Sequence, residues 1–229
     1  MPMNLFDILG PVMVGPSSSH TAGAVRIGRM ARRLLGEGTP VMAKITLCGS
    51  FAATGQGHGT DRALVAGLLG MQPDDGRIPN SFAVAKEKGM GYTFSRANLS
   101  GEHPNTAKIE LAGKQGGKLS MIASSLGGGR IMVVEMNGLR VSFSGDLPTL
   151  IVQNRDQPGH VRDVSDILAR AGVNIATLHL YRDYPGGSAV MIIETDKVVE
   201  KEHLDQLRGI RGIHGVTFVS AEKEGHHGH

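Results

Sequence analysis

The order of strand-like and helix-like segments after Thr149 constrains the fold more than any other feature of the chain. The pattern is a strand, a helix that ends at Gly172, two strands joined by the turn Tyr184-Pro185-Gly186-Gly187, a second helix and a last strand. These segments cover residues 150–152, 161–171, 174–181, 189–194, 200–207 and 215–219. A βαββαβ order within about 70 residues predicts a ferredoxin-like fold.

The part of the chain before the turn Gly145-Asp146-Leu147-Pro148 has a different order, with helices early and a sheet late. Helices are predicted where apolar residues recur at helical spacing, over residues 5–9, 27–35, 61–69 and 81–89. Strands are predicted over 41–48, 108–111, 118–124, 130–136 and 141–143. The fold class is therefore α+β, with a helix and antiparallel-sheet domain over 1–146 and a ferredoxin-like domain over 147–229.

The composition suits a soluble globular protein and excludes several classes of function. Hydrophobic residues make up 40% and charged residues 20%. No apolar run approaches the ~20 residues that span a bilayer, and the first residues lack a charged segment followed by an apolar one. We therefore expect a cytoplasmic protein that does not bind membranes. Acidic and basic residues interleave at a net charge of +3 and aromatics are 4%, so no nucleic-acid partner is expected.

A polar run stands where a helix is predicted to begin, in the sequence Gly15-Pro16-Ser17-Ser18-Ser19-His20-Thr21. The first N–H groups of a helix lack partners within it, and the helix dipole favours an anion there. The hydroxyl groups in this run therefore suit a carboxylate or a phosphate. The alternative is that they only cap the helix.

A second polar run, Gly55-Gln56-Gly57-His58-Gly59-Thr60-Asp61, precedes the next helix, for which Thr60 or Asp61 is the predicted N-cap. A third is His103-Pro104-Asn105-Thr106. Alternatively, His58 is a loop histidine without a role, and His103 is a turn residue before proline. The arginines at 26, 29, 32 and 33 are expected to form a solvated helix face.

The C-terminal part resembles an ACT domain, the small regulatory module that binds amino acids in metabolic enzymes. The matching residues are Asp156-Gln157-Pro158-Gly159 and Gly172-Val173-Asn174-Ile175. Gly159 opens a helix whose N–H groups suit a carboxylate, and Asp156 suits an ammonium group. The resemblance implies an amino-acid effector site formed by Asp156, Pro158, Gly159 and Asn174, and self-association through this domain. The alternative is that Asp-x-Pro-Gly is only a good turn.

The N-terminal part resembles the allosteric-substrate-binding-type domain of iron–sulfur-dependent L-serine dehydratases. With the following ACT domain, the architecture is similar to the beta chain of the two-chain enzyme, over nearly all of residues 3–220. The His226-His227-Gly228-His229 tail falls outside the resemblance. The motifs that carry it are Phe6-Asp7, the three polar runs at 15–21, 55–61 and 103–106, and Ser125-Leu126-Gly127-Gly128-Gly129.

The resemblance implies that the protein converts L-serine to pyruvate and ammonia together with an alpha subunit. In this family a [4Fe–4S] cluster acts on the substrate, and such clusters take about three or four cysteines. Cys48 is the only cysteine here, and the family places the cluster cysteines on a separate alpha chain. The resemblance thus implies that the alpha subunit holds the cluster, that this chain holds no metal, and that it is inactive alone. We expect Cys48 itself to be a small buried hydrophobic residue.

The same resemblance suggests which residues reach the substrate. The expected catalytic residues are His20 and His58, because an imidazole exchanges a proton near neutral pH. Asp61 is also a candidate for orienting His58. The expected substrate-binding residues are Ser17, Ser18, Ser19, Thr21, Thr60, Asp61, Asn105 and Thr106.

Two other functions stay open at this point. In the first, the chain is a regulatory subunit without catalysis, and both of its halves bind an amino-acid or phosphate effector. Alternatively, the N-terminal half serves another enzyme such as a phosphoglycerate dehydrogenase, where similar domains occur. The absence of a Gly-x-Gly-x-x-Gly motif after a strand argues against a dinucleotide-binding enzyme in this chain.

Overall fold

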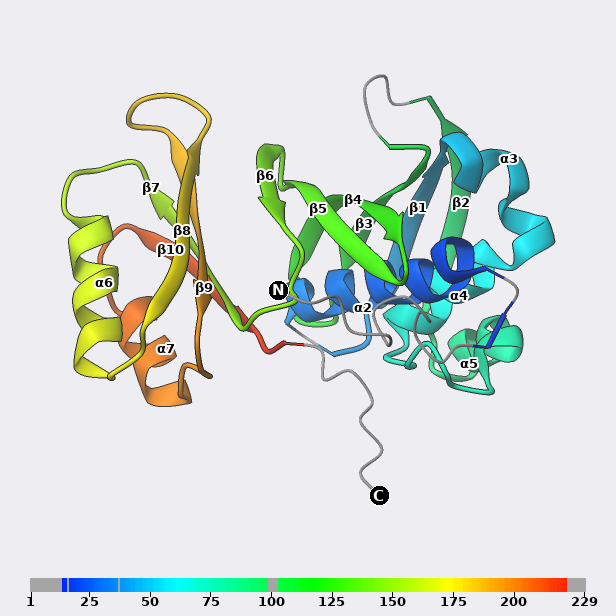
Figure 1. Cartoon of the computed structure of the whole chain (residues 1–229), viewed down its shortest axis with the longest axis horizontal. Coiled ribbons are helices and arrows are strands. Elements are labelled where there is room, and N and C mark those ends of the chain that lie inside the picture. Colours follow the sequence, from blue (N-terminus) through cyan, green and yellow to red (C-terminus); the bar gives the residue numbers. More distant parts are fainter. Residues whose placement is uncertain (1–13, 16, 37, 99–102, 222–229) are drawn as a thin grey trace, which may run out of the picture. The chain divides into compact units, whose positions relative to one another are not determined.

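The computed structural model describes residues 14–15, 17–36, 38–98 and 103–221, in two compact units over 1–138 and 139–229 (Figure 1). The expected helical face at Leu5, Ile8 and Leu9 and the histidine-rich tail lie outside the described residues. The units confirm the mixed helix-and-sheet class.

The first unit combines helices with a six-stranded sheet. The last strand of this sheet, β6, begins at Leu139, directly after the boundary between the two units. Its helical elements are the π-helix η1 (Ser18–Gly23), α2 (Ala24–Leu35), α3 (Gly49–His58), α4 (Thr60–Leu68), the 3-10 helix η2 (Ile78–Asn80) and α5 (Ser81–Glu87). The strands are β1 (Met42–Cys48), β2 (Gly91–Ala97), β3 (Asn105–Ala112), β4 (Lys118–Gly127), β5 (Arg130–Met136) and β6 (Leu139–Phe143), in the order β2-β1-β3-β4-β5-β6.

The sheet differs from the predicted antiparallel sheet at one edge, where it has an additional strand, β2. Strand β2 pairs with β1 in parallel, whereas β1–β3, β3–β4 and β4–β5 are antiparallel. Ile45, Ile109 and Met121 stand side by side in register and are almost fully buried, which marks the face of the sheet that forms the core. Helix α2 contacts β3, β4 and β5, so it covers this face.

Helices α2 and α4 cross with their backbones in contact, and two glycines make this possible. A Cβ atom added at Gly28 would lie 2.3 Å from the Leu64 carbonyl oxygen, and one added at Gly67 would lie 2.1 Å from the Val25 carbonyl oxygen. Real Cβ atoms do not approach backbone this closely. The close crossing therefore depends on both glycines.

The arginines of α2 are not a solvated face, so that prediction was wrong. Arg26 donates to the Gly129 carbonyl (3.2 Å), Arg29 to the carbonyls of Gly70 and Met71 (3.1 and 3.2 Å), and Arg32 to the Leu68 carbonyl (3.3 Å). Carbonyls at the end of a helix lack partners within it, and cations are favourable there. Arg32 thus satisfies the last carbonyl of α4, Arg29 holds the loop that follows this helix, and Arg26 holds the turn between β4 and β5.

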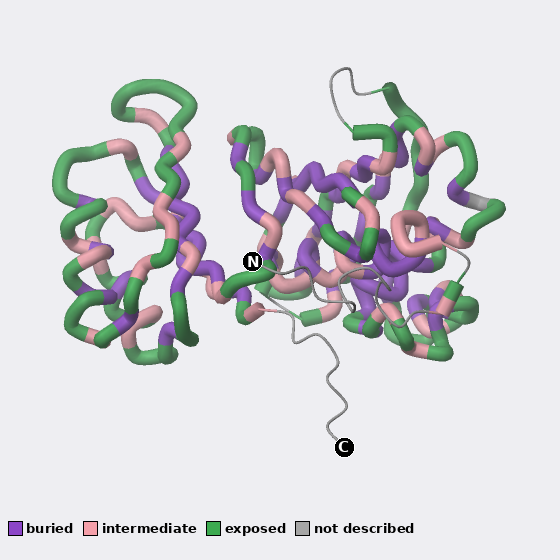
Figure 2. The backbone as a smooth tube through the Cα atoms, viewed as in Figure 1, coloured by how far each residue is buried: buried purple, intermediate pink, exposed green. Residues whose placement is uncertain are grey.

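The second unit confirms the predicted βαββαβ order. Its elements are β7 (Thr149–Arg155), α6 (His160–Arg170), β8 (Ile175–Arg182), β9 (Ser188–Thr195), α7 (Lys201–Arg208) and β10 (Ile213–Val219), in one antiparallel sheet of order β10-β7-β9-β8. Leu150 and Val152 of β7 and Met191 of β9 form a core with Val164 and Leu168 of α6. Figure 2 shows the central strand β9 mostly buried and the edge strand β8 largely exposed.

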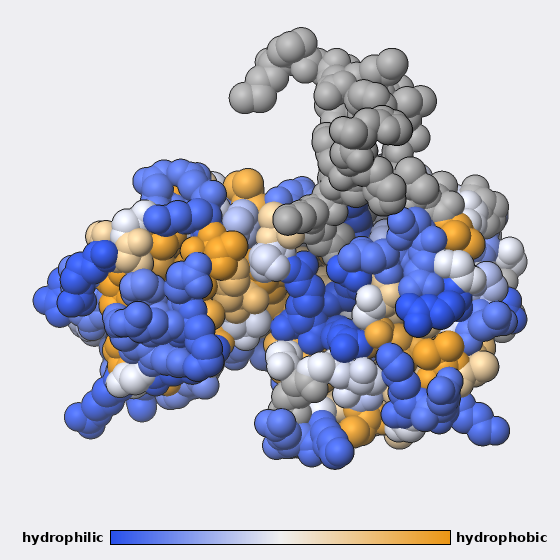
Figure 3. Space-filling view, turned by 90° about the horizontal axis from the view of Figure 1, so that it is seen from below, coloured by the Kyte–Doolittle hydropathy of each residue, from blue (hydrophilic) through white to orange (hydrophobic). Residues whose placement is uncertain are grey.

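No helix among the described residues is long and apolar enough to cross a membrane. On the face of the molecule drawn in Figure 3, hydrophilic residues predominate and hydrophobic ones form separate patches.

The crossing of α2 and α4 predicts opposite effects for two glycine-to-alanine changes in helices. Gly67→Ala puts a Cβ against backbone that cannot move aside, so it is expected to lower the free energy of unfolding by about 1–3 kcal/mol. Gly57→Ala in α3 meets nothing within 4 Å, so it is expected to raise stability by up to about 1 kcal/mol. Urea unfolding of both variants measures this difference. Equal stability of the two variants would contradict the role given to Gly67.

Candidate active site

The serine-rich run forms the start of a helix, as predicted, but its first turn is a π-helix. Ser17 is the N-cap, and its Oγ accepts a hydrogen bond from the His20 backbone N–H (3.2 Å). Gly15 has a φ of 142°, and a Cβ there would lie 2.5 Å from Thr21 Oγ1, so only glycine fits. Short π-helical segments inside α-helices are frequent at functional sites.

The His20 side chain is surrounded by hydroxyl groups from two elements. Its Nδ1 lies 3.3 Å from Ser17 Oγ at the start of η1. Its Nε2 lies 3.2 Å from Ser50 Oγ and 3.0 Å from Thr54 Oγ1, both on α3. The ring also meets the edge of the buried Phe51 ring, with the ring centres 5.4 Å apart. His20 is therefore held between η1 and α3.

His58, at the end of α3, completes this group. The rings of His20 and His58 are 5.0 Å apart between centres and tilted by 44°. His58 is exposed, whereas His20 is half-buried. The structure thus brings together the two histidines that the sequence predicted as catalytic, although 38 positions separate them (58 minus 20).

The surroundings of His20 keep its imidazole neutral. Burial is the largest effect that lowers the pKa of His20, and the charge of a protonated His58 lowers it further. A backbone hydrogen bond with Ser50 opposes these effects and raises it. The net shift is below the ordinary value, so His20 carries a free lone pair at neutral pH and is fit to accept a proton.

Buried hydroxyl groups line the other side of η1. Thr21 is 3% exposed and Ser125 is fully buried, and among the described residues neither Thr21 Oγ1 nor Ser125 Oγ has a hydrogen-bond partner. A Cβ at Gly23 would lie 2.0 Å from Ser125 Oγ, so strand β4 packs directly on η1. The Ser125-Leu126-Gly127-Gly128-Gly129 motif supplies this contact and a turn in which Gly127, Gly128 and Gly129 all have positive φ.

The remaining predicted substrate ligands are less accessible. Thr60 and Thr106 are fully buried. The Thr106 hydroxyl donates to the His103 carbonyl (2.6 Å) and lies 2.7 Å from Ser124 Oγ. Asn105, which forms a β-bridge with Gly49, has a buried Oδ1 without a partner. Of this set, Thr60 Oγ1 and Asn105 Oδ1 have no hydrogen-bond partner among the described residues, and Asn105 lies beside the start of α3.

The predicted N-cap of α4 was wrong. The cap is Gly59, with a φ of 70°, and neither Thr60 nor Asp61 makes a capping hydrogen bond from its side chain. The chain leaves α3 at His58 and enters α4 at Thr60, and this abrupt change of direction requires the left-handed backbone that glycine adopts readily. His103 Nδ1 accepts from the Asn105 N–H (3.1 Å), which agrees with the turn alternative for His103.

Asp61 lies at a separate hollow. Its carboxylate accepts from the Arg62 N–H (2.8 Å). It lines an open cavity of about 230 Å³ that is formed by Leu47, Phe51, Ala52, Asp61, Phe94, Ser95 and Arg96. Phe51 belongs both to this cavity and to the ring contact with His20. Phe51 therefore adjoins both the cavity and the His20 ring.

Sequence reasoning missed Ser50 and Thr54, which contact His20 directly. No helix was predicted between residues 48 and 61, whereas α3 begins at Gly49 and includes both residues. Within a helix Ser50, Thr54 and His58 stand four residues apart and share one face. This spacing was the available signal, and three glycines in α3 concealed it, because glycine disfavours a helix.

The predicted effector residues of the second unit lie in two places. Asp156 accepts from Arg182 Nη1 and from the Gly186 N–H, both at 3.0 Å, and these contacts hold its pKa below the ordinary value. Pro158 lies in the same loop, and Gly159, with a φ of 100°, caps the start of α6. Asn174 follows the other end of α6 and donates to Asp196 (2.6 Å). An 11-residue helix separates the two loops, a length of about 16 Å.

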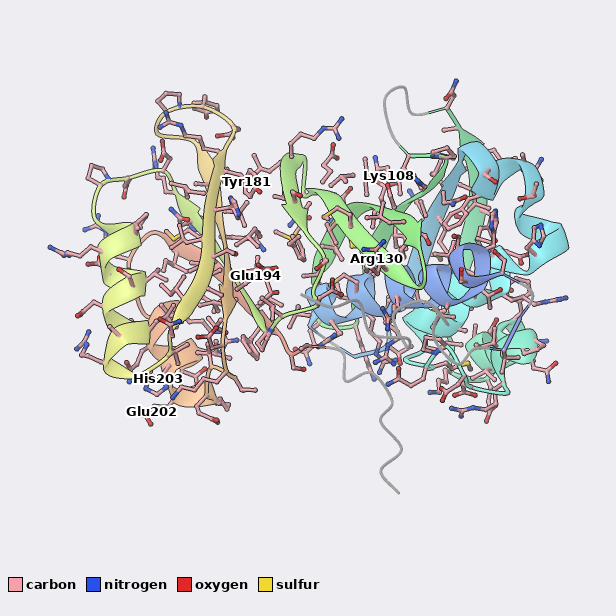
Figure 4. The ribbon with its side chains drawn as sticks, viewed as in Figure 1. Lys108, Arg130, Tyr181, Glu194, Glu202 and His203 are labelled. Atoms are coloured by element: carbon pink, nitrogen blue, oxygen red, sulfur yellow. The ribbon has the colours of Figure 1, made fainter. Side chains whose placement is uncertain are left out.

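Strand β8, at the edge of this sheet, presents a ring pair and an exposed leucine. Tyr181, labelled in Figure 4, stacks with His179 at 6.1 Å between ring centres. Leu180 is 44% exposed. Glu194 of β9, also labelled, accepts from Thr177 of β8 (2.8 Å) and ties the edge strand to its neighbour.

The described residues do not fit a [4Fe–4S] cluster. Among them, no group of three or more His, Cys, Asp or Glu side chains is arranged to hold a metal ion. Cys48 is buried at the end of β1, in the role of a small hydrophobic residue that its sequence context predicts. The chemistry of these residues is that of proton transfer and hydrogen bonding.

Comparisons with known proteins agree with a two-module chain. Residues 4–90 match the family model described as "Serine dehydratase beta chain", and residues 148–212 match the ACT domain. The chain is 40% identical over 217 residues to the "Probable L-serine dehydratase, beta chain" of Bacillus subtilis (strain 168), covering 95% of this chain and 98% of that protein. It is 38% identical over 215 residues to the L-serine dehydratase beta chain of Peptoniphilus asaccharolyticus, covering 93% and 96%. The chain therefore belongs to the serine dehydratase beta-chain family.

A more distant relative bears on the alternative that the N-terminal half serves an enzyme such as a phosphoglycerate dehydrogenase. The D-3-phosphoglycerate dehydrogenase of Methanocaldococcus jannaschii is 26% identical over 160 residues, which is 69% of this chain but 30% of that enzyme. The likeness thus covers a minor part of the dehydrogenase, whereas the beta chains match over nearly their whole length.

The lowered pKa of His20 predicts a dependence of stability on pH. Below the ordinary value of about 6.5 the unfolded chain binds this proton before the folded chain does. The stability contributed by neutral His20 is therefore present above that value and is lost as the pH falls toward the folded pKa. His20→Gln is expected to weaken the loss of stability on acidification, measured by urea unfolding between pH 7.5 and 5. His214→Gln, at an exposed histidine of β10, is the control. Parallel curves for His20→Gln and the parent would contradict this assignment.

Proposed function

We propose that this chain is the beta subunit of an L-serine dehydratase and supplies proton-transfer and substrate-binding groups to an active site shared with an alpha subunit. The observation that carries the proposal is the pair of imidazole rings of His20 and His58, which are 5.0 Å apart, with His20 held by hydroxyl groups from η1 and from α3. Family membership supports the substrate, L-serine. We place the [4Fe–4S] cluster on the alpha subunit, because the described residues offer it no ligand set.

The reaction requires a base and an acid close together. Loss of the α-proton and of the β-hydroxide from serine gives aminoacrylate, and its hydrolysis releases pyruvate and ammonia. His20, neutral at pH 7, suits the base. His58 is exposed and suits exchange of a proton with the substrate or with water. Two positive rings at this distance repel each other, so the pair holds one proton more readily than two.

The substrate carboxylate is proposed to bind at the start of η1. Ser18 and Ser19 are half-buried, and they begin a helical segment that continues through α2 to Leu35. Backbone N–H groups in the first turn and serine hydroxyls together suit an anion. Thr21 and Asn105 stand behind this position, with buried oxygens that have no hydrogen-bond partner among the described residues. Thr106 acts by hydrogen bonds within the protein. Thr60, fully buried and also with an unpartnered hydroxyl, acts by packing.

We further propose that the ACT domain pairs with a second copy along β8 and binds an amino-acid effector between the copies. The loops of Asp156 and of Asn174 lie at opposite ends of α6, so one copy does not unite them in one site. An edge strand offers unpaired N–H and C=O groups to a second strand. Pairing of two copies brings residues of both into one effector site.

The catalytic role predicts that the histidines are needed for turnover. This chain mixed with its alpha subunit under anaerobic conditions is expected to form pyruvate from L-serine, and the chain alone is not. His20→Gln and His58→Gln are each expected to lower kcat by about 10²- to 10⁴-fold, the usual contribution of a general acid or base. His214→Gln is the control. Unchanged turnover in both variants, with an intact complex, would favour a regulatory subunit without catalysis.

The pairing along β8 predicts that a charge on this strand separates the copies. Leu180→Lys places two lysines near each other in a symmetric pair and discourages edge pairing. Sedimentation velocity is expected to show a dimer for the parent chain and a monomer for this variant. Val161→Lys, at an exposed valine of α6, is the control and stays dimeric. A parent chain that sediments as a monomer would refute this arrangement.

A further inference from the structure

The hydroxyl of Thr54 is engaged on two sides, and this limits how it can serve His20. Thr54 Oγ1 donates its single hydrogen to the Ser50 carbonyl one turn earlier in α3, at 2.9 Å. The same oxygen lies 3.0 Å from His20 Nε2. A hydroxyl has one hydrogen and two lone pairs. With its hydrogen committed, Thr54 Oγ1 has only lone pairs to offer to the ring.

The contacts on the opposite side of the ring agree with this limit. Ser17 Oγ accepts the His20 backbone N–H (3.2 Å), which leaves its own hydrogen available. It lies 3.3 Å from His20 Nδ1. If Nδ1 carried the ring hydrogen, Ser17 Oγ would accept twice and its hydrogen would have no partner among these groups. If Nε2 carries it, the hydrogens of Ser17 Oγ, of the ring and of Thr54 Oγ1 each have an acceptor among these groups.

We propose that Thr54 is a positioning residue that fixes neutral His20 as the tautomer with its hydrogen on Nε2, so that the free lone pair is on Nδ1 and faces Ser17. The chain of donors then runs from Ser17 Oγ–H to Nδ1 and from Nε2–H through Thr54 Oγ1 to the Ser50 carbonyl. Ser50 Oγ, 3.2 Å from Nε2, adds a second acceptor.

This assignment decides where His20 can take a proton. The lone pair on Nδ1 points to the start of η1, where the Ser17 hydroxyl stands, and Nε2 points to α3. The catalytic consequence rests on the proposed function, since it makes the Ser17 side of the ring the reactive side. The tautomer itself depends only on the contacts of η1 with α3, and it is measurable in this chain without the alpha subunit.

Nitrogen-15 NMR of the full chain tests the tautomer directly. A ring nitrogen that carries hydrogen and one that does not have well-separated shifts, and His20→Gln identifies the signals. At a pH above the titration of His20, the parent is expected to show the hydrogen on Nε2. Thr54→Val removes the acceptor and is expected to raise the fraction with the hydrogen on Nδ1, whereas Thr54→Ser restores the parent signals.

A control variant and a check that α3 stays folded complete the test. Thr46→Val, which removes a hydroxyl that lies 2.9 Å from Ser95 Oγ on the neighbouring strand, is the matched control. Unchanged amide signals of α3 in Thr54→Val show that the helix is intact. A parent His20 with its hydrogen on Nδ1, or a Thr54→Val variant with an unshifted tautomer and an intact α3, would overturn the proposal.

Kinetic measurements on the complex with the alpha subunit distinguish a failure of this proposal from a failure of the proposed function. Thr54→Val is expected to lower kcat by about 10- to 100-fold with little change in KM, the size of effect seen when the orienting partner of a functional histidine is removed. Thr54→Ser is expected to recover most of the rate. A shifted tautomer with unchanged kcat would support the assignment of Thr54 and contradict the catalytic role of His20.

Discussion

The turn at Gly49 is the constraint on which the candidate site depends. The chain leaves strand β1 at Cys48 and enters helix α3 at once, with a φ of 53° at Gly49. A Cβ there would lie 2.5 Å from the Pro104 carbonyl oxygen, which also accepts the Ser50 N–H at 2.7 Å. This contact sets the direction of α3, and the direction of α3 aims Ser50, Thr54 and His58 at His20. A side chain at residue 49 would move the whole helix away from η1.

The sequence was most informative where hydrophobic periodicity was undisturbed. The βαββαβ order of the second unit was predicted correctly, because the central strands β7 and β9 contain continuous apolar runs and α6 has apolar residues at helical spacing. The first unit was predicted less completely. Strand β2 was missed although Tyr92 and Phe94 alternate with Thr93 and Ser95, the period of a strand. Helix α3 was missed because its glycines obscure the helical pattern, and tertiary contacts through Phe51 hold it in place.

The candidate site was predictable in its residues but not in its contacts. His20 and His58 were both singled out from short polar runs, and no local rule states that the runs meet. Their meeting depends on the Gly49 turn and on the seating of η1 against Ser125, which are contacts between distant segments. The arginines of α2 show the same limit, since the carbonyls that they satisfy belong to α4 and to the β4–β5 turn.

The burial of the two histidines suits an active site that is finished by another chain. His20 is half-buried and fixed by hydroxyl groups, so its orientation does not depend on a partner. His58 is exposed on the face of α3 that also carries Ser50 and Thr54, where a partner surface can cover it and exclude water. Covering would strengthen the electrostatic coupling between the rings, because charges interact more strongly where water is excluded. Under the proposed function, a chain that holds one imidazole in place and leaves the next one open is arranged so that assembly with the alpha subunit, rather than folding alone, completes the site.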